Sequence, residues 1–172
     1  SHTAGACVIA FLARKMIGGN PKKVEFILYG SFAKTYKGHG TDRALLGGLM
    51  GFGTDDVRIR DSFSIAAERG IEYKFTPNSE LTEIHPNTVD VCMEDEDGRK
   101  VTVRGESLGG GKVRIVKIDQ VDIDFSGEYS AIILVHRDRP GVIAYISKIL
   151  SEHNINIAFM KLYRESKGNK AY

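Results

Sequence analysis

The segment Val24-Glu25-Phe26-Ile27-Leu28-Tyr29, followed at once by Gly30-Ser31, carries the clearest structural signal in the chain. A short run of branched and aromatic side chains is typical of a buried strand, and the glycine and serine after it predict a turn. In α/β folds, loops that bind ligands follow the carboxyl ends of strands. We therefore expect a mixed α/β domain in which a functional loop begins at Gly30.

Further elements are predicted on both sides of this strand. A helix through about Ile17 precedes it, with Ser1 or Thr3 as the N-cap, and another helix runs from Asp42, again as the N-cap, to about Met50. The remaining elements predicted for this domain are a helix over 61–69 and strands over 71–75, 88–93, 100–104 and 112–117.

Glycines mark the turns between the later strands. Asp97-Gly98 favours a tight hairpin, and Gly109-Gly110-Gly111 favours a turn with positive backbone angles. The first domain should end near Ser126. A second domain is predicted as a strand over 130–136, a turn over 137–141, a helix over 142–153 and a strand over 154–162.

Two polar segments, 1–5 and 29–42, crowd hydroxyls, imidazoles and glycines together near the start of the chain. His39 lies between Gly38 and Gly40, and flanking glycines let a backbone approach a ligand closely. Imidazole changes its protonation near neutral pH. These segments therefore predict a binding and proton-transfer site.

Five short segments together resemble the β subunit of the iron–sulfur-dependent L-serine dehydratases, also called L-serine deaminases. Their order and spacing give the resemblance its specificity, and it runs along essentially the whole chain. These five marker segments are Ser1-His2-Thr3-Ala4-Gly5-Ala6, Tyr29-Gly30-Ser31-Phe32-Ala33, Lys37-Gly38-His39-Gly40-Thr41-Asp42, His85-Pro86-Asn87-Thr88 and Ser107-Leu108-Gly109-Gly110-Gly111.

The second domain resembles the opening half of an ACT domain, a ferredoxin-like module that usually binds amino acids and pairs its sheets between subunits. The two resemblances imply an α+β protein. A mixed α/β serine dehydratase β-type domain, similar to an allosteric substrate-binding domain, is expected over 1–126. An ACT domain is expected over 129–172, with a further strand, helix and strand to follow Tyr172.

The resemblance also implies an enzyme that converts L-serine to pyruvate and ammonia by β-elimination of water. In the family, a [4Fe–4S] cluster with an open iron acts as the Lewis acid that takes the substrate hydroxyl. Such a cluster needs about three cysteines. This chain has two, Cys7 and Cys92, in no metal-ligand spacing, so we expect the cluster on a partner α subunit and no metal site here.

Site roles follow from the resemblance and from side-chain chemistry. His39 is the expected general base, with a loop histidine that only contacts a nearby carbonyl as the simpler alternative. Asp42 is either a helix cap or a group that orients His39. His85 and Asn87 form either a plain turn, with Asn87 at an unusual backbone angle, or a ligand or subunit contact. The expected substrate-binding residues are Ser1, His2, Thr3 and Thr41, and for His2 a plain helix-capping Ser-His-Thr segment is the alternative.

The ACT-like part carries its own candidates. The residues expected to contact an amino-acid effector are Asp138, Arg139, Pro140, Gly141 and Asn154. The alternatives are that these residues form an ordinary turn and that the module serves only for self-association.

Composition narrows the class of partner. The 24 basic and 22 acidic residues give a net charge of +2 and are mixed along the chain, which disfavours nucleic acid as a partner. No apolar run is long enough to span a bilayer. We expect a cytoplasmic protein with reduced thiols. Besides the catalytic subunit, two functions stay open: a regulatory subunit that senses serine without doing chemistry, and a scaffold that only dimerises.

Overall fold

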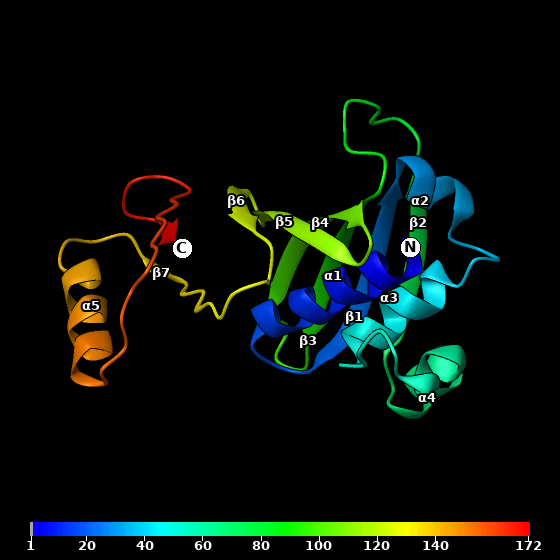
Figure 1. Ribbon diagram of the computed structural model, residues 1–172, viewed down its shortest axis with the longest axis horizontal. Coiled ribbons are helices and arrows are strands. Elements are labelled where there is room, and N and C mark those ends of the chain that lie inside the picture. Colours follow the sequence, from blue (N-terminus) through cyan, green and yellow to red (C-terminus); the bar gives the residue numbers. More distant parts are fainter. Residues whose placement is uncertain (1) are drawn as a thin grey trace. The chain divides into compact units, whose positions relative to one another are not determined.

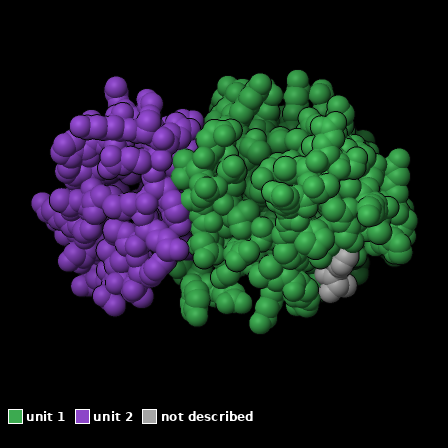
Figure 2. Space-filling model, turned by 90° about the horizontal axis from the view of Figure 1, so that it is seen from above, with its two compact units in different colours: residues 1–130 green, residues 131–172 purple. Residues whose placement is uncertain are grey.

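The computed structural model describes the backbone of residues 2–172 and side chains from Thr3 onward. The chain divides into two compact units, Ser1–Ser130 (unit 1) and Ala131–Tyr172 (unit 2), coloured separately in Figure 2. The predicted N-caps at Ser1 and Thr3 differ in outcome. Ser1 lies outside the described residues, and Thr3 lies within the first helix rather than before it.

Unit 1 is built on a six-stranded sheet with the order β2-β1-β3-β4-β5-β6 (Figure 1). β1 and β2 run parallel, and every other neighbouring pair is antiparallel. The strands are β1 (Pro21–Tyr29), β2 (Glu72–Asn78), β3 (Thr88–Asp95), β4 (Lys100–Gly109), β5 (Lys112–Ile118) and β6 (Val121–Phe125).

The first five of these strands confirm the predicted ones, and β6 was missed. β6 is only five residues long and follows β5 after two residues, Asp119 and Gln120. Asp119 turns the chain with a positive φ of 52°. The turn contains no glycine or proline, so the sequence lacked the residues that usually mark a turn between two strands.

Helices cover one face of this sheet. α1 (His2–Ile17) and α3 (Thr41–Leu49) lie side by side across it (Figure 1). Val89, Val91 and Met93 alternate along β3 toward the helices and are buried. The other elements of the layer are α2 (Gly30–Thr35), the 3-10 helix η1 (Val57–Asp61) and α4 (Ser62–Glu68). The three predicted helices of unit 1 are therefore confirmed, and α2 is an additional one.

Glycines hold α1 close to its neighbours. A Cβ at Gly48 of α3 would collide with the backbone carbonyl of Cys7, and a Cβ at Gly105 of β4 would collide with Ile9. Gly5, in the first turn of α1, faces Ser107 of β4 in the same way. α1 is thus fixed between α3 and β4 by contacts that leave no room for a methyl group.

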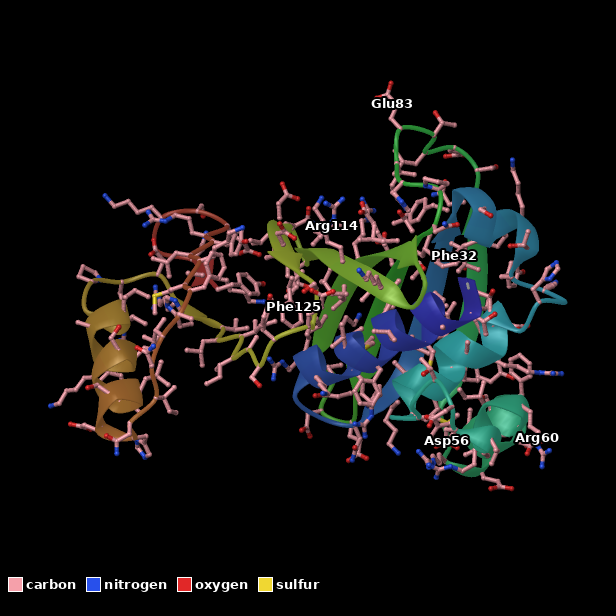
Figure 3. The ribbon with its side chains drawn as sticks, in the orientation of Figure 1. Phe32, Asp56, Arg60, Glu83, Arg114 and Phe125 are labelled. Atoms are coloured by element: carbon pink, nitrogen blue, oxygen red, sulfur yellow. The ribbon has the colours of Figure 1, made fainter. Side chains whose placement is uncertain are left out.

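The opposite face of the sheet carries ion pairs. Arg104 pairs with Asp90 at 2.7 Å, and Arg114 pairs with Glu106 at 2.8 Å. Figure 3 labels Arg114 on β5 and also Glu83, which lies at the tip of the loop between β2 and β3 and points away from the sheet. The helix-covered face therefore forms the apolar core, while the other face is polar.

Unit 2 contains α5 (Val142–Glu152) and a two-stranded sheet of β7 (His136–Arg137) and β8 (Lys170–Ala171). α5 confirms the predicted helix. The strands predicted over 130–136 and 154–162 are wrong, apart from His136 itself. A strand is held by hydrogen bonds to a neighbouring strand, and most of these two segments has none among the described residues. Their apolar side chains, including Ile132 and Phe159, are exposed.

Candidate active site

The first and third marker segments meet at the start of α1. The Thr3 hydroxyl donates a hydrogen bond to the backbone carbonyl of His39 over 3.3 Å. His39 stands in the loop that precedes α3, so this contact joins two segments that are 36 residues apart in the sequence. The two polar segments singled out in the sequence are therefore neighbours in the fold.

The second and fourth marker segments also meet. The Ser31 backbone N–H donates to the Pro86 carbonyl at 2.6 Å. Gly30 has a φ of +53°, and a Cβ there would collide with the Pro86 backbone. The end of β1 and the turn before β3 thus pack backbone against backbone, which only glycine permits at position 30.

The fifth marker segment closes the set. The Ser107 backbone N–H donates to the Asn87 carbonyl at 2.9 Å, and the Ser107 side chain lies against Gly5. The predicted positive backbone angles of Gly109, Gly110 and Gly111 are confirmed, at 95°, 61° and 80°. All five marker segments are therefore linked by direct contacts around the first turn of α1 and the ends of β1, β3 and β4.

His39 lies in an open loop between Gly38 and Gly40. Its side chain is exposed, and its neighbours Gly38 and Gly40 take positive φ angles of 88° and 79° with open space around them. The Thr3 contact engages its backbone and leaves the imidazole accessible. This is the arrangement that a proton-transfer group needs if the substrate arrives on another surface.

The cap predicted at Asp42 is wrong. α3 begins at Thr41, and its N-cap is Gly40 in the left-handed conformation, so Asp42 lies inside the first turn. The Asp42 carboxylate accepts from the backbone N–H of Arg43 at 2.8 Å. With the left-handed Gly40 as its N-cap, α3 begins two residues earlier than it would with a cap at Asp42. Thr41 itself is fully buried.

The segment around His85 forms a turn. The backbone N–H of Asn87 donates to His85 Nδ1 at 3.2 Å, and the Thr88 hydroxyl donates to the His85 carbonyl at 2.6 Å. The unusual backbone angle expected at Asn87 is wrong, because Asp119 and Asn154 are the non-glycine residues with positive φ among those described. The His85 imidazole accepts a bond from the backbone two residues further on, as an asparagine or aspartate side chain does in many turns.

A buried network stabilises the strand end that leads into Gly30. The Tyr29 hydroxyl donates to Asp90 Oδ2 at 2.7 Å, and Arg104 donates to both oxygens of Asp90, over 2.7 and 2.8 Å. Burial, together with the hydrogen bond to Asp90, raises the pKa of Tyr29 to about 12. The hydrogen bonds to Asp90 raise the pKa of Arg104 as well.

The raised pKa predicts how Tyr29→Phe changes alkaline stability. An unfolded tyrosine loses its proton near pH 10, whereas Tyr29 in the folded chain keeps its proton to about pH 12. The stability that Tyr29 contributes is therefore complete below pH 10 and is lost as the pH rises toward 12. Urea unfolding of both proteins at pH 8 to 11.5 should show the wild type losing stability relative to Tyr29→Phe above pH 10. A constant difference would contradict the raised pKa.

The two cysteines do not fit an iron–sulfur cluster. Cys7 is buried in α1, where its thiol donates to the Phe52 carbonyl at 3.4 Å, and burial raises its pKa to about 11. Cys92 lies in β3 between Val91 and Met93, so it faces the polar side of the sheet, and burial raises its pKa as well. Cluster ligands are thiolates, which raised pKa values disfavour.

The candidate effector residues of unit 2 lie at the two ends of α5. Asp138 accepts from the Gly168 N–H at 3.2 Å and pairs with Arg164 at 3.4 Å, while Gly141 is the N-cap of α5. Asn154 follows the last turn with a positive φ of 55°, which is a common helix end. The 11 residues of α5 span about 16 Å. The structure therefore groups Asp138 to Gly141 and leaves Asn154 apart.

The described residues also bear on two other features, metal sites and membrane-spanning helices. No three histidine, cysteine, aspartate or glutamate side chains among them gather closely enough to hold a metal ion. None of the described helices combines the length and the apolar character needed to cross a bilayer.

Comparisons with known proteins agree with this fold. The family described as "Serine dehydratase beta chain" matches residues 1–117, and the ACT domain family matches residues 129–171. The chain is 48% identical over 157 residues to the "L-serine dehydratase, beta chain" of Peptoniphilus asaccharolyticus, covering 90% of this chain and 71% of the relative. It is 40% identical over 171 residues to the "Probable L-serine dehydratase, beta chain" of Bacillus subtilis, covering 99% and 77%.

More distant relatives belong to another enzyme. The chain is 31% identical over 150 residues to the "D-3-phosphoglycerate dehydrogenase" of Archaeoglobus fulgidus, which covers 87% of this chain and only 28% of that relative. The similarity to this dehydrogenase is therefore limited to one part of a longer protein. The matches over most of both chains are those to the dehydratase β chains, and the chain therefore belongs to the serine dehydratase β-chain family and carries a C-terminal ACT domain.

Proposed function

We propose that this L-serine dehydratase β chain contributes substrate-binding and proton-transfer residues to an active site that an α chain completes. The reaction is the β-elimination of water from L-serine, which yields pyruvate and ammonia. The observation that carries the proposal is the convergence of all five marker segments beside an exposed histidine. Residues spread over more than 100 positions are brought to one end of unit 1, as a shared functional site requires.

In this proposal His39 takes the α-proton of the substrate. A neutral imidazole accepts a proton near physiological pH, and the glycines on either side leave the ring open to a substrate held by the partner. His2, Thr3 and Thr41, with Ser1, contact the substrate, while Asp42 and His85 orient the loops or meet the partner. Ser1 and the side chain of His2 lie outside the described part of the chain.

The α chain carries the [4Fe–4S] cluster in this proposal. The support from this chain is chemical, because its two thiols lie on opposite sides of the sheet and have raised pKa values. We assign the catalytic contribution to residues 1–126. Residues 129–172 form the ACT domain, which binds an amino acid such as L-serine near Asp138 to Gly141 and mediates self-association. The assembled enzyme works in the cytoplasm.

A regulatory function is the alternative, and one observation favours it. Part of a D-3-phosphoglycerate dehydrogenase resembles this chain over 87% of the chain's length, and a dehydrogenase is a different enzyme from a dehydratase. A module shared by two different enzymes fits control of activity better than one particular chemical step. In that case the chain would change the cooperativity of serine turnover while the rate at saturation stayed the same.

Mixing the chains separates these functions. Pyruvate formation from L-serine is measured anaerobically with this chain alone, with the cluster-bearing α chain alone, and with both. We expect activity only in the mixture, since neither chain holds a complete site. An α chain that reaches the same saturated rate by itself would rule out the catalytic proposal and leave regulation or scaffolding.

A further inference from the structure

The strand β2 forms one edge of the six-stranded sheet of unit 1 (Figure 1). It pairs with β1 along its whole length, Glu72–Asn78, and its other edge meets no strand among the described residues. No backbone hydrogen bond from a turn or loop of the described residues engages β2 either. Its N–H and C=O groups that point away from β1 are therefore open, and such an edge accepts a strand from another chain.

The open part of this edge is the beginning of β2. Residues 72–74 are all exposed, whereas the next two are half-buried. Pro77, near the other end, has no N–H to give to a neighbouring strand. Ile71, just before β2, already donates its N–H to the Ala66 carbonyl at 2.9 Å. The edge therefore permits a short strand pairing that is centred on residues 72–74.

The charges of these residues complement one another when the strand is paired with a reversed copy of itself. Side chains alternate along a strand, so Glu72 and Lys74 lie on the polar face of the sheet and Tyr73 on the face that the helices cover. In an antiparallel pair with Tyr73 opposite Tyr73, Glu72 of each copy lies directly opposite Lys74 of the other. Opposite charges at such positions stabilise a strand pair.

Other registers lack this complementarity. A pair centred on Lys74 would put two lysines opposite each other, and a pair centred on Glu72 would do the same with two glutamates, which is destabilising. A shift by a single residue would place the helix-covered face of one copy beside the polar face of the other. The charges and the two faces of the sheet therefore favour the register centred on Tyr73.

Tyr73 has the surroundings of a contact residue. Its ring stacks on Phe63 of α4 with centroids 5.5 Å apart and meets Phe75 edge to face at 5.9 Å. The residue is nevertheless 38% exposed. In the register described above the two Tyr73 side chains are direct cross-strand neighbours, and aromatic pairs at such positions are stabilising. Because each ring is already held by its own neighbours, pairing orders little that was free before.

We propose that β2 pairs with β2 of a second copy of this chain, antiparallel and centred on Tyr73, so that two six-stranded sheets join into one. A second copy is the occupant because the strand's own charges, read in reverse, complement it. The contact belongs to unit 1 and lies outside the five marker segments. It is therefore separate from self-association through the ACT domain, and it does not depend on the proposed catalytic function.

Charge reversal tests the register in the full chain. Sedimentation over a dilution series at low salt gives the dissociation constant of the self-associated form. We expect Glu72→Lys and Lys74→Glu each to weaken association about tenfold, because each replaces two opposite-charge pairs by two like-charge pairs. The double variant Glu72→Lys/Lys74→Glu re-forms both pairs and should associate like the wild type.

Lys100→Glu is the matched control for charge. It makes the same change as Lys74→Glu, on an exposed lysine of the same sheet, but β4 is an interior strand. It should leave association unchanged. The proposal is overturned if neither single reversal weakens association, if the double variant is as weak as the single ones, or if Lys100→Glu weakens it equally. Reversals that weaken binding of the α chain but not self-association would assign the edge to that chain instead.

Cross-linking tests the alignment of the two strands independently. In a Cys92→Ser background, which leaves only the buried Cys7, Tyr73→Cys places two thiols directly opposite each other across the strand pair. A short bismaleimide should then link two copies. Pro77→Cys in the same background is the control, since the two positions 77 would lie about 27 Å apart along the strands. Equal linking of both variants, or no linking of Tyr73→Cys, would rule out this pairing.

Discussion

The assembled enzyme with His39→Ala should turn over L-serine about 100-fold more slowly than the wild type, because loss of a positioned general base typically costs a factor of this size or more. The residue is exposed between two glycines, so its removal leaves no cavity and should not change the Tm. The rate is measured at saturating serine, under anaerobic conditions, from pyruvate formation.

His153→Ala is the matched control for this experiment. His153 is also exposed, but it caps α5 in unit 2, where its Nδ1 lies 2.9 Å from the Ile149 carbonyl. It should leave the saturated rate unchanged. Added imidazole should restore part of the activity of His39→Ala, because a free base can enter the space left by the side chain. Full activity of His39→Ala would assign the base to another residue and favour the regulatory function.

The largest effect on stability is expected for Gly48→Ala. The new methyl group would meet the Cys7 carbonyl and the Ala10 side chain, and a backbone carbonyl cannot move aside as a flexible side chain can. Overpacking of this kind lowers the free energy of unfolding by about 1–3 kcal/mol. The higher helix propensity of alanine raises it by about 1 kcal/mol. We take the cost at or above the top of that range and expect a net loss of about 2 kcal/mol in the free energy of unfolding.

Gly47→Ala, one residue earlier in the same helix, is the control. Its methyl group would meet mainly side-chain atoms, the Ser62 hydroxyl at 3.0 Å and Ile59 at 3.1 Å, which can shift. We expect this variant to unfold within about 1 kcal/mol of the wild type. Urea unfolding measures both variants. Equal stability of the two would show that α1 and α3 can separate without cost, contrary to the tight crossing described above.

Local patterns predicted the elements of unit 1 well. The run from Val24 to Tyr29 forms β1, and the turn glycines 109–111 have the positive angles expected of them. These features depend on neighbouring residues alone. The convergence of the marker segments could not be derived in this way, because the contact of Thr3 with His39 or of Gly5 with Ser107 exists only once the sheet is assembled.

The wrong predictions have physical causes of the same kind. The segments 130–136 and 154–162 have the composition of strands, but a strand also needs a partner, and composition does not reveal one. Asp42 has the side chain of an N-cap, yet the left-handed Gly40 starts α3 before it. The open edge of β2 was invisible in the sequence for a further reason, since the order of the strands in a sheet is a tertiary property.

The uncovered apolar side chains of unit 2 affect how this protein must be measured. Ile132, Phe159 and Leu162 are 65%, 72% and 61% exposed, and such side chains lose their contact with water whenever two surfaces meet. If two copies of the chain associate through these side chains, the apparent stability of unit 2 increases with protein concentration. The melting temperature then depends on the protein concentration at which it is measured. It has to be measured over a dilution series before it can be interpreted thermodynamically.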